Sequence, residues 1–342
     1  MMAAPVQSVP STEQAVQKLT IGKALNFGLR AAMEADDKVL VMGEDVGKLG
    51  GVFRITDGLQ KDFGEHRVLD TPLAESGIVG TAIGLAVRGF RPVCEIQFEG
   101  FIFPGFDQIV SQLAKLHYRT QGGVKVPVVI RVPYGGGIGA VEHHSESPES
   151  LFAHVAGLKV VSCSNPVDAY WMIQQAIRCD DPVLFFEPKK LYHSGALKQP
   201  VDTTATPEPL FASRTLRTGT AATLVAYGPS VPVCLDAATA AAEEGTSLEV
   251  IDLRSVSPLD LAPVFESVRR TGRLIAVSEA PSESSVTAEI AARVQQECFY
   301  SLEAPVLRVT GFDTPYPPAK LEEHFLPDLD RVLHAVDRAL DW

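Results

Sequence analysis

The sequence contains no uninterrupted apolar run approaching the roughly 20 residues that a helix needs to cross a bilayer. Basic residues are also in deficit: 30 lysines and arginines stand against 42 aspartates and glutamates, for a formal net charge of -12. A chain with this acidic excess has no general electrostatic attraction to nucleic acids or anionic membranes. We therefore expect a soluble protein whose partners are neither nucleic acid nor membrane.

Cysteine is scarce and scattered. No C-x-x-C pair occurs among the five cysteines, which are Cys94, Cys163, Cys179, Cys234 and Cys298. Widely spaced single cysteines indicate neither a disulfide framework nor a zinc site, which is typical of a reducing compartment. The opening "MMAAPVQSVPSTEQAVQKLT" lacks the charged segment and apolar core of a secretory signal, and it lacks the arginines of an organelle transit peptide. These absences predict a cytoplasmic protein in which residues 1–18 form a flexible N-terminus.

A length of 342 residues exceeds the usual size of one domain and predicts two. Short apolar strands alternate with helical patterns in the first part of the chain, as in "KVLVMGED", "PVCEIQF" and "PVLFFE". A second βα series includes "AATLVAYG", "SLEVIDLR" and "RLIAVSEA". Strands that are apolar throughout and separated by helices are typical of a parallel sheet covered on both faces. We predict an α/β fold with a first domain over 19–195, a linker over 196–218 and a second domain over 219–342.

In open α/β sheets, binding sites form beyond the carboxyl ends of the strands. That rule selects Glu44, the stretches 70–75 and 97–101, and the loop 133–147. Glu75 opens an apolar, glycine-spaced run, "ESGIVGTAIGLAV", that predicts a buried helix. A carboxylate in the first turn usually complements the positive end of the helix dipole. The alternative is that Glu75 acts on a molecule bound at the end of the sheet, and spacing alone does not decide between the two.

The stretch "YGGGIGAVEHHSESPES" joins a glycine-rich backbone to adjacent histidines. His143 or His144 could serve as an acid, a base or a hydrogen-bond donor near neutral pH, and surface or capping histidines are the ordinary alternative. The glycines match neither G-x-G-x-x-G nor a P-loop, and metal binding by Glu142, His143 and His144 lacks the H-E-x-x-H helix pattern. Phe101 either packs in the core or stacks on a flat heterocycle.

Several stretches occur together and in order along both predicted domains: "GEDVG", "DTPLAESGIVGTAIGLA", "EIQFEGFIFPGFDQIVSQLAK", "HHSESPESLFAH", "DPVLFFEPKKLY", "LEVIDLRSVSPLD" and "LEAPVLRVTGFDTPYPP". From about Leu19 onward this combination resembles the beta subunit of thiamine-diphosphate-dependent 2-oxo acid dehydrogenases, and it looks closer to branched-chain than to pyruvate members. The resemblance implies a pyrimidine-binding domain with a parallel sheet and a transketolase-type C-terminal domain, assembled with alpha subunits as a heterotetramer of two of each.

The resemblance also implies roles for particular residues. The glutamate matching Glu75 hydrogen-bonds N1′ of the cofactor's aminopyrimidine and favours the tautomer that removes the C2 proton of the thiazolium. The residue matching Phe101 flanks the aminopyrimidine, and branched-chain relatives often have tyrosine there. Leu73 and Gln97 match other residues lining the cofactor pocket, with Glu44 expected behind them. His144 matches a histidine that helps in substrate binding and in acyl transfer to lipoamide.

A G-D-G motif, which holds Mg²⁺ and the cofactor diphosphate in thiamine-diphosphate enzymes, does not occur in this sequence. We therefore expect a separate alpha chain to supply the Mg²⁺ half of the site. Some relatives also hold a structural potassium ion (K⁺), largely through main-chain oxygens. The matching positions in this sequence are Val126, Val128, Ala176, Cys179 and Asp181.

Two further partners are implied, the lipoyl domain and the basic peripheral-subunit-binding domain of the dihydrolipoamide acyltransferase. An acidic C-terminal portion is either a solvated helix face or the docking surface for that basic domain, and its residues are Glu322, Glu323, Asp328, Asp330, Asp337 and Asp341. The predicted reaction is oxidative decarboxylation of branched-chain 2-oxo acids with reductive acylation of the lipoyl domain. The alternatives are a pyruvate or acetoin dehydrogenase beta subunit, a split transketolase-like transferase and a non-catalytic scaffold.

Overall fold

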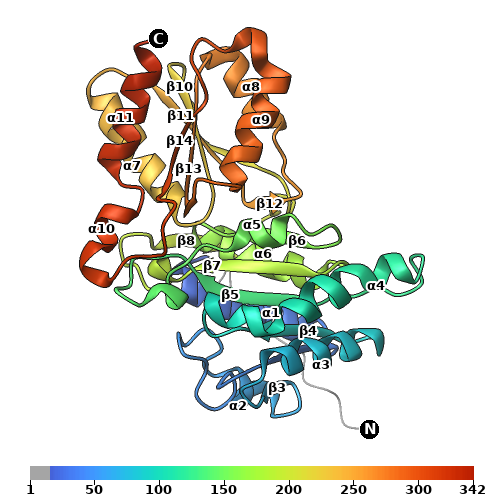
Figure 1. Cartoon of the computed structure of the whole chain (residues 1–342). Coiled ribbons are helices and arrows are strands. Elements are labelled where there is room, and N and C mark those ends of the chain that lie inside the picture. The colour runs from blue at the N-terminus through green and yellow to red at the C-terminus, as the bar shows by residue number, and fades with distance from the viewer. Residues whose placement is uncertain (1–15) are drawn as a thin grey trace.

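The computed structural model describes residues 16–342, whose strands form two main sheets (Figure 1). The first sheet has seven strands in the order β12-β6-β7-β5-β4-β2-β3. These strands are β2 (Val39–Gly43), β3 (Val68–Asp70), β4 (Arg91–Glu95), β5 (Val129–Tyr134), β6 (Lys159–Ser162), β7 (Val183–Pro188) and β12 (Ser255–Ser257). All neighbours pair in parallel except β12 and β6. The prediction of a parallel sheet in the first part of the chain is confirmed.

Helices cover both faces of this sheet, because alternate strand residues point to opposite sides. Val93 packs in the core beneath one pair of helices, and its neighbour Cys94 packs in the core on the other face. The first face is covered by α1 (Ile21–Ala35) and α6 (Pro166–Arg178). The second face is covered by α3 (Glu75–Val87), η3 (Gln108–Leu113), α4 (Ala114–Arg119) and α5 (Glu149–Ala153), while α2 (Leu59–Phe63) lies near β3.

Two helix starts illustrate why the sequence folds locally as it does. The Thr20 side chain accepts a hydrogen bond from Lys23 N at the start of α1, and the Asn165 side chain accepts one from Asp168 N at the start of α6. Each polar side chain satisfies a backbone donor that the helix itself leaves free. Both helices therefore begin directly after a residue whose side chain caps them.

The second sheet has five strands in the order β14-β13-β10-β11-β9, all parallel except β9 against β11. Figure 1 shows helices on both of its sides, with α7 and α11 on one and α8 and α9 on the other. Its elements are β9 (Arg214–Arg217), β10 (Ala222–Ala226), α7 (Ser230–Glu243), β11 (Leu248–Asp252), α8 (Ala262–Thr271), β13 (Leu274–Pro281), α9 (Val286–Cys298), β14 (Leu307–Gly311) and α11 (Leu329–Leu340).

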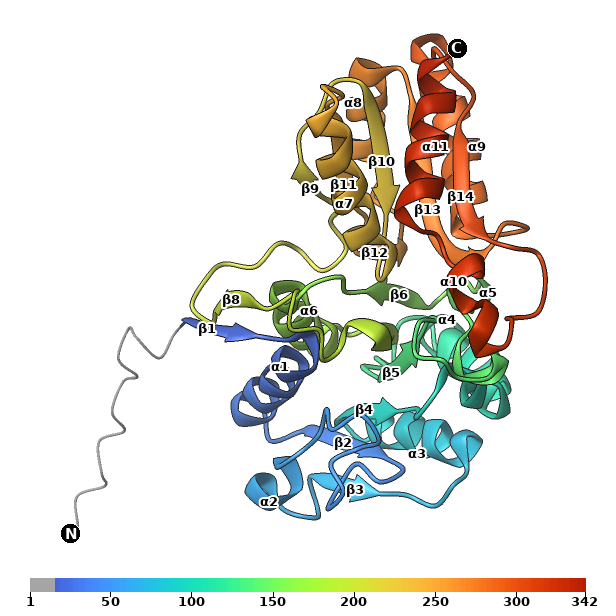
Figure 2. The ribbon, with the colours of Figure 1, turned by 90° about the vertical axis from the view of Figure 1, so that its left-hand side faces the viewer.

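The two sheets are joined more closely than the sequence predicts. Strand β12 follows β11 of the second sheet, yet it pairs with β6 of the first (Figure 2). Beside it, the guanidinium of Arg254, which is 1% exposed, donates from Nε to Asp168 Oδ1 over 3.1 Å. The Tyr227 hydroxyl likewise donates to the Glu149 carboxylate in the first domain. These buried polar contacts fix one domain against the other.

Two of the predicted boundaries need correction. Residues 16–18 fall in the predicted flexible N-terminus, but they belong to strand β1 (Val16–Leu19), which pairs with β8 (Gln199–Asp202). The predicted linker 196–218 contains two strands, β8 and β9. The sequence did not predict them, because these short strands are too polar to give an apolar pattern. The remaining residues of the predicted flexible segment, 1–15, lie outside the described part of the chain.

Two observations concern the chain's environment. All five cysteines are free thiols, and four of them are buried. Across residues 16–342, none of the helices combines the length and apolar character required to pass through a bilayer.

Candidate functional site

Two carboxylates meet at the carboxyl ends of the first sheet. Glu44 directly follows β2, and Glu75 is the first residue of α3, which begins just beyond β3. Both are buried, with 8% of Glu44 and 5% of Glu75 exposed. Burial, and then the nearby charges of Glu75 and Asp45, raise the pKa of Glu44. Its Oε1 atom is buried without a hydrogen-bond partner, which is costly unless a bound group or a proton satisfies it.

Three contacting rings, those of Phe98, Phe101 and His144, form an aromatic wall. The turn η2 (Glu99–Gly105) carries Phe101 and packs against α3, the helix that begins at Glu75, and the turn η4 (Glu142–His144) carries His144. The His144 ring stacks on Phe98 with centroids 3.9 Å apart and meets Phe101 edge to face at 5.1 Å. A Cβ atom on Gly100 would lie 2.3 Å from the carbonyl oxygen of His143, so only glycine permits this approach. The structure thus brings together Phe101 and His144 from segments far apart in the sequence.

The two adjacent histidines differ in their surroundings. The side chain of His143 is 52% exposed and lies 3.4 Å from a Glu142 carboxylate oxygen. His144 is partly buried, and its Nδ1 lies 2.8 Å from the His143 carbonyl oxygen. In the neutral ring Nδ1 therefore carries the proton, which leaves Nε2 as the acceptor. Of the two, His144 is the one held in the aromatic wall.

The metal alternative for Glu142, His143 and His144 is not supported. No group of three or more His, Cys, Asp or Glu side chains in the described range 16–342 is arranged to hold a metal ion. The cause is geometric, because Nδ1 of His144 is engaged with the backbone and its ring is stacked on Phe98.

Gln97 and Leu73, the other two residues matched to the cofactor pocket, differ in their contacts and exposure. Gln97 Nε2 donates to Asp45 Oδ2 over 3.2 Å, which places it next to Glu44 in the carboxylate cluster. Leu73 is 81% exposed on the loop before α3. The face of α3 that follows it carries small residues and is open, with Ser76, Gly77, Thr81 and Gly84 all exposed. The predicted buried helix is therefore buried on one face only.

A buried ion pair, not predicted from the sequence, supports the aromatic wall. Lys189 Nζ, immediately after β7, lies 2.7 Å from Glu99 Oε2 at the start of η2, and both side chains are fully buried. Burial raises the pKa of Glu99 to about 7, although the Lys189 charge opposes the shift. Burial also lowers the pKa of Lys189, with Glu99 acting against it. The only sequence signal was a lysine directly after an apolar strand in "PVLFFEPKK".

The residues matched to a potassium site converge at the opposite end of the sheet. Val126 N donates to the Asp180 carbonyl oxygen over 3.2 Å, which brings 126–128 beside 176–181. Arg91 donates from one nitrogen to the carbonyl oxygens of Ile177 and Cys179, at 3.0 and 3.2 Å. Main-chain carbonyls and the Asp181 carboxylate are hard oxygen donors of the kind that alkali and alkaline-earth cations take. This cluster lies at the start of β5 and β7, away from Glu75.

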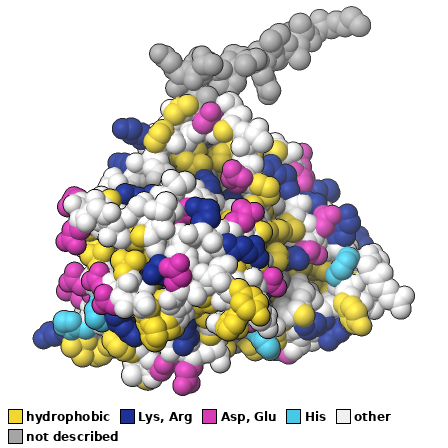
Figure 3. All heavy atoms as spheres, turned by 90° about the horizontal axis from the view of Figure 1, so that it is seen from above, with side chains coloured by type: hydrophobic (Ala, Val, Ile, Leu, Met, Phe, Trp, Pro, Cys, Tyr) yellow, Lys and Arg dark blue, Asp and Glu magenta, His cyan; other side chains and the backbone are white. Residues whose placement is uncertain are grey.

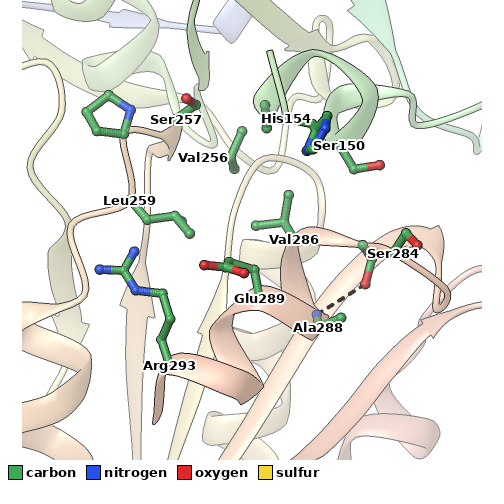
Figure 4. A pocket seen from close by; sticks show the side chains of 13 residues that line it. Ser150, His154, Val256, Ser257, Leu259, Ser284, Val286, Ala288, Glu289 and Arg293 are labelled. Atoms are coloured by element: carbon green, nitrogen blue, oxygen red, sulfur yellow. Dashed lines mark hydrogen bonds between the residues drawn. The ribbon is translucent and has the colours of Figure 1, made fainter. Parts of the chain in front are cut away.

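Residues of both domains line several cavities. One of about 590 Å³ is lined by His154 of α5 and by Glu289 and Arg293 of α9 (Figure 4). None of the predicted site residues lines it. A smaller cavity of about 240 Å³ is lined by Ser145 and Glu279, next to the loop that carries His144. The carboxylates and aromatic rings described above, rather than the larger cavity, form the candidate site.

The acidic C-terminal portion is not a uniform surface. Figure 3 shows acidic and basic side chains intermixed over the face seen from above. Glu322 is 7% exposed and accepts hydrogen bonds from Gly139 N, so it is not part of a solvated face. Asp328 caps α11 by accepting from Arg331 N over 2.8 Å. Glu322 therefore belongs neither to a solvated helix face nor to an exposed docking surface.

Comparison with known proteins assigns both parts of the chain. Residues 17–194 match the family described as "Transketolase, pyrimidine binding domain", and residues 212–332 match "Transketolase, C-terminal domain". The chain is 63% identical over 342 residues to the "Pyruvate dehydrogenase E1 component subunit beta" of Leifsonia xyli subsp. xyli, and the match covers 100% of both. The chain belongs to the beta subunits of 2-oxo acid dehydrogenases. This family depends on thiamine diphosphate and pairs with an alpha subunit.

Other relatives within the beta-subunit family carry a different substrate name. The chain is 54% identical over 325 residues to the "3-methyl-2-oxobutanoate dehydrogenase subunit beta" of Mycobacterium tuberculosis, covering 95% of this chain and 92% of the relative. A solved structure described as "Split gene transketolase, inactive beta4 tetramer" matches with a TM-score of 0.76 at 20% identity, covering 95% and 99% of the two chains. Identity this low shows the fold alone. The relatives' names favour a beta subunit over the transferase and scaffold alternatives.

Proposed function

We propose that this beta subunit supplies the aminopyrimidine half of a thiamine-diphosphate site and acts on branched-chain 2-oxo acids. The observation that carries the proposal is the pair of buried carboxylates, Glu44 after β2 and Glu75 at the start of α3, the helix against which the turn bearing Phe101 packs. The unpartnered Glu44 Oε1 and the start of α3 at Glu75 fit a flat, hydrogen-bonding heterocycle. When bound, the cofactor supplies the electron sink for decarboxylation.

Each residue has a distinct task under this proposal. Glu75 would hold a proton at N1′ of the aminopyrimidine, since a carboxyl group in a desolvated site can share a proton that water would remove. The Phe101 ring would flank the heterocycle. Gln97 and Leu73 would line the rest of the pocket.

The acidic group behind them is Glu44, whose pKa is raised by burial and then by the nearby charge of Glu75. His144 would contact the incoming acyl acceptor through Nε2, because Nδ1 is engaged.

We propose that the alpha subunit brings Mg²⁺, since the sequence has no G-D-G motif. The open small-residue face of α3 and the exposed Leu73 would be covered by that subunit, because small residues let a partner helix approach closely. The same assembly would receive the lipoyl and peripheral-subunit-binding domains of an acyltransferase. The unpaired cysteines fit the proposed cytoplasmic location.

The substrate preference is tested by comparing kcat/KM for two 2-oxo acids, 3-methyl-2-oxobutanoate and pyruvate. The branched-chain proposal rests on the quoted sequence motifs and on the name of the 54% identical relative, while the name of the 63% identical relative favours pyruvate. The chain co-expressed with its alpha subunit should decarboxylate 3-methyl-2-oxobutanoate with a kcat/KM at least about tenfold above that for pyruvate, which is the discrimination available to a pocket shaped for a branched side chain. A higher kcat/KM for pyruvate would assign the chain to the pyruvate alternative.

We also propose that the cluster at 126–128 and 176–181 binds a structural potassium ion. Binding to the folded state alone raises stability by mass action. The melting temperature of the assembled enzyme should therefore be about 1–3 °C higher in KCl than in choline chloride of equal ionic strength. Asp181→Ala should abolish the difference. Equal melting temperatures in the two salts for the wild type would contradict the proposal.

A further inference from the structure

The loop that carries His144 begins where β5 ends. It leaves the sheet at Gly135 and reaches η4 after a run of glycines. Within the first domain, Gly135 N donates to the Glu146 carbonyl oxygen over 3.0 Å, and His144 N donates to the Val141 carbonyl oxygen over 3.0 Å. The glycines between these two points would have high conformational entropy on their own. Contacts from elsewhere in the chain therefore matter for the position of this part of the loop.

The second domain holds this loop with two carboxylates. Gly136 N donates to Glu279 Oε2 over 3.0 Å, and Gly139 N donates to both carboxylate oxygens of Glu322 at 3.2 Å each. Both carboxylates are at least nine-tenths buried. Hydrogen bonds from backbone N–H groups to ionised carboxylates are among the stronger ones in proteins.

Side chains from both domains approach the backbone of this loop closely at Gly136 and Gly137. A Cβ atom on Gly136 would lie 2.0 Å from the Tyr316 hydroxyl oxygen, and one on Gly137 would lie 2.3 Å from Cδ of Lys190. Gly137 also has a φ of +87°, which other residues rarely adopt. Tyr316 of the second domain and Lys190 of the first domain thus lie close to the loop where Gly136 and Gly137 carry no side chains.

The two carboxylates are themselves fixed relative to the first domain. Glu279 lies within β13, and Glu322 begins the short helix α10 (Glu322–Phe325). The pairing of β12 with β6 and the buried contact of Arg254 with Asp168 prevent the domains from shifting freely. A displacement of the loop away from Glu279 and Glu322 would therefore change the position of His144 against Phe98.

We propose that Glu279 and Glu322 are positioning residues through which the second domain sets the place of His144 in the site. This inference rests on the proposed role of His144 toward the acyl acceptor. Neither carboxylate touches the aromatic wall, so each acts through the loop backbone. The second domain then contributes to catalysis as well as to stability.

The test compares four single variants and one double variant in the assembled alpha–beta enzyme. Glu322→Ala removes both acceptors of Gly139 N, and Glu322→Gln restores one of them. Glu323→Ala is the matched control, because Glu323 is the next residue of the same helix and is exposed. His144→Ala reports what the histidine itself contributes. The double variant of Glu322→Ala with His144→Ala completes a cycle.

Two quantities are measured. The first is amide hydrogen–deuterium exchange in peptides covering 135–144, which reports the loop directly and needs no turnover. The second is the rate of reductive acylation of a lipoyl domain. We expect Glu322→Ala to speed exchange in this segment and to lower the acylation rate about 10- to 100-fold, as small misplacements of a catalytic group do. Glu322→Gln should lie between it and the wild type, and Glu323→Ala should match the wild type.

The double variant distinguishes positioning from general destabilisation. If Glu322 acts through His144, adding Glu322→Ala to His144→Ala causes no further loss of rate, whereas a merely structural defect lowers the rate equally in both backgrounds. Unchanged exchange in Glu322→Ala, or faster exchange with an unchanged rate, overturns the inference while leaving the proposed function intact. A His144→Ala enzyme with the wild-type rate shows instead that the proposed role of His144 is wrong.

Discussion

Replacement of Glu75 by glutamine is expected to lower kcat of the assembled enzyme by about 10²- to 10⁴-fold, the usual contribution of a positioned acid or base. Glutamine keeps the shape of the side chain at the start of α3 but cannot hold the shared proton at N1′. Because Glu75 is 5% exposed, water cannot take over that task. The measurement is the steady-state decarboxylation rate of the enzyme containing both subunits.

The control for this experiment is Glu65→Gln. Glu65 is an exposed glutamate on the turn before β3, so its replacement should leave kcat unchanged. Glu44→Gln should have a smaller effect than Glu75→Gln, since the proton at N1′ is assigned to Glu75 and a glutamine at position 44 keeps an oxygen that can accept a hydrogen bond. A Glu75→Gln enzyme with the kcat of the wild type would remove the basis for the catalytic assignment.

The second large effect concerns stability. Arg131 lies fully buried in β5 between two carboxylates, with Nε and Nη2 donating to Glu187 at 2.7 and 2.8 Å and Nη1 donating to Glu95. Replacing Arg131 by methionine leaves two buried carboxylates without a counter-charge. Breaking a buried ion pair in this way typically costs about 3–5 kcal/mol. We expect the melting temperature to fall by roughly 5–10 °C.

The Arg131→Met defect should grow with pH. Burial already raises the pKa of Glu95, and the opposing influence of Arg131 is lost in the variant. The folded state then binds more protons than the unfolded state above the ordinary glutamate pKa of about 4.3, so stability falls as pH rises. Melting curves at pH 5.5 and 8 should show the larger loss at pH 8. Arg338→Met, at an exposed position on α11, is the control and should change stability little at either pH.

Much of the architecture could be predicted because strong local signals agreed with the tertiary structure. Asn165-Pro166 combines a side-chain cap with a proline that fits the first helical turn, and α6 begins at Pro166. Apolar strands such as β7 are buried on both faces, so composition alone indicated a covered parallel sheet. The rule that sites form at carboxyl ends of strands selected Glu44 and Glu75.

The missed features all depend on contacts distant in sequence. Strand β12 has three residues and exists only because β6 lies beside it. The segment 99–113 forms the 3-10 turn η2 and the π-helix η3, with Pro104 inside the first. The interdomain acceptors Glu279 and Glu322 carry no local signal, because their partners are backbone amides of a glycine loop.

The role of Glu75 is tested most directly by the exchange rate of the proton at C2 of thiamine diphosphate, bound to the assembled enzyme with Mg²⁺. This rate is measured by proton NMR after quenching in deuterated buffer. The wild type should exchange this proton orders of magnitude faster than the free cofactor does. In the Glu75→Gln enzyme, with the cofactor still bound, the rate should return close to that of the free cofactor. Equal exchange rates in the wild type and the variant would contradict the claim that Glu75 activates the cofactor.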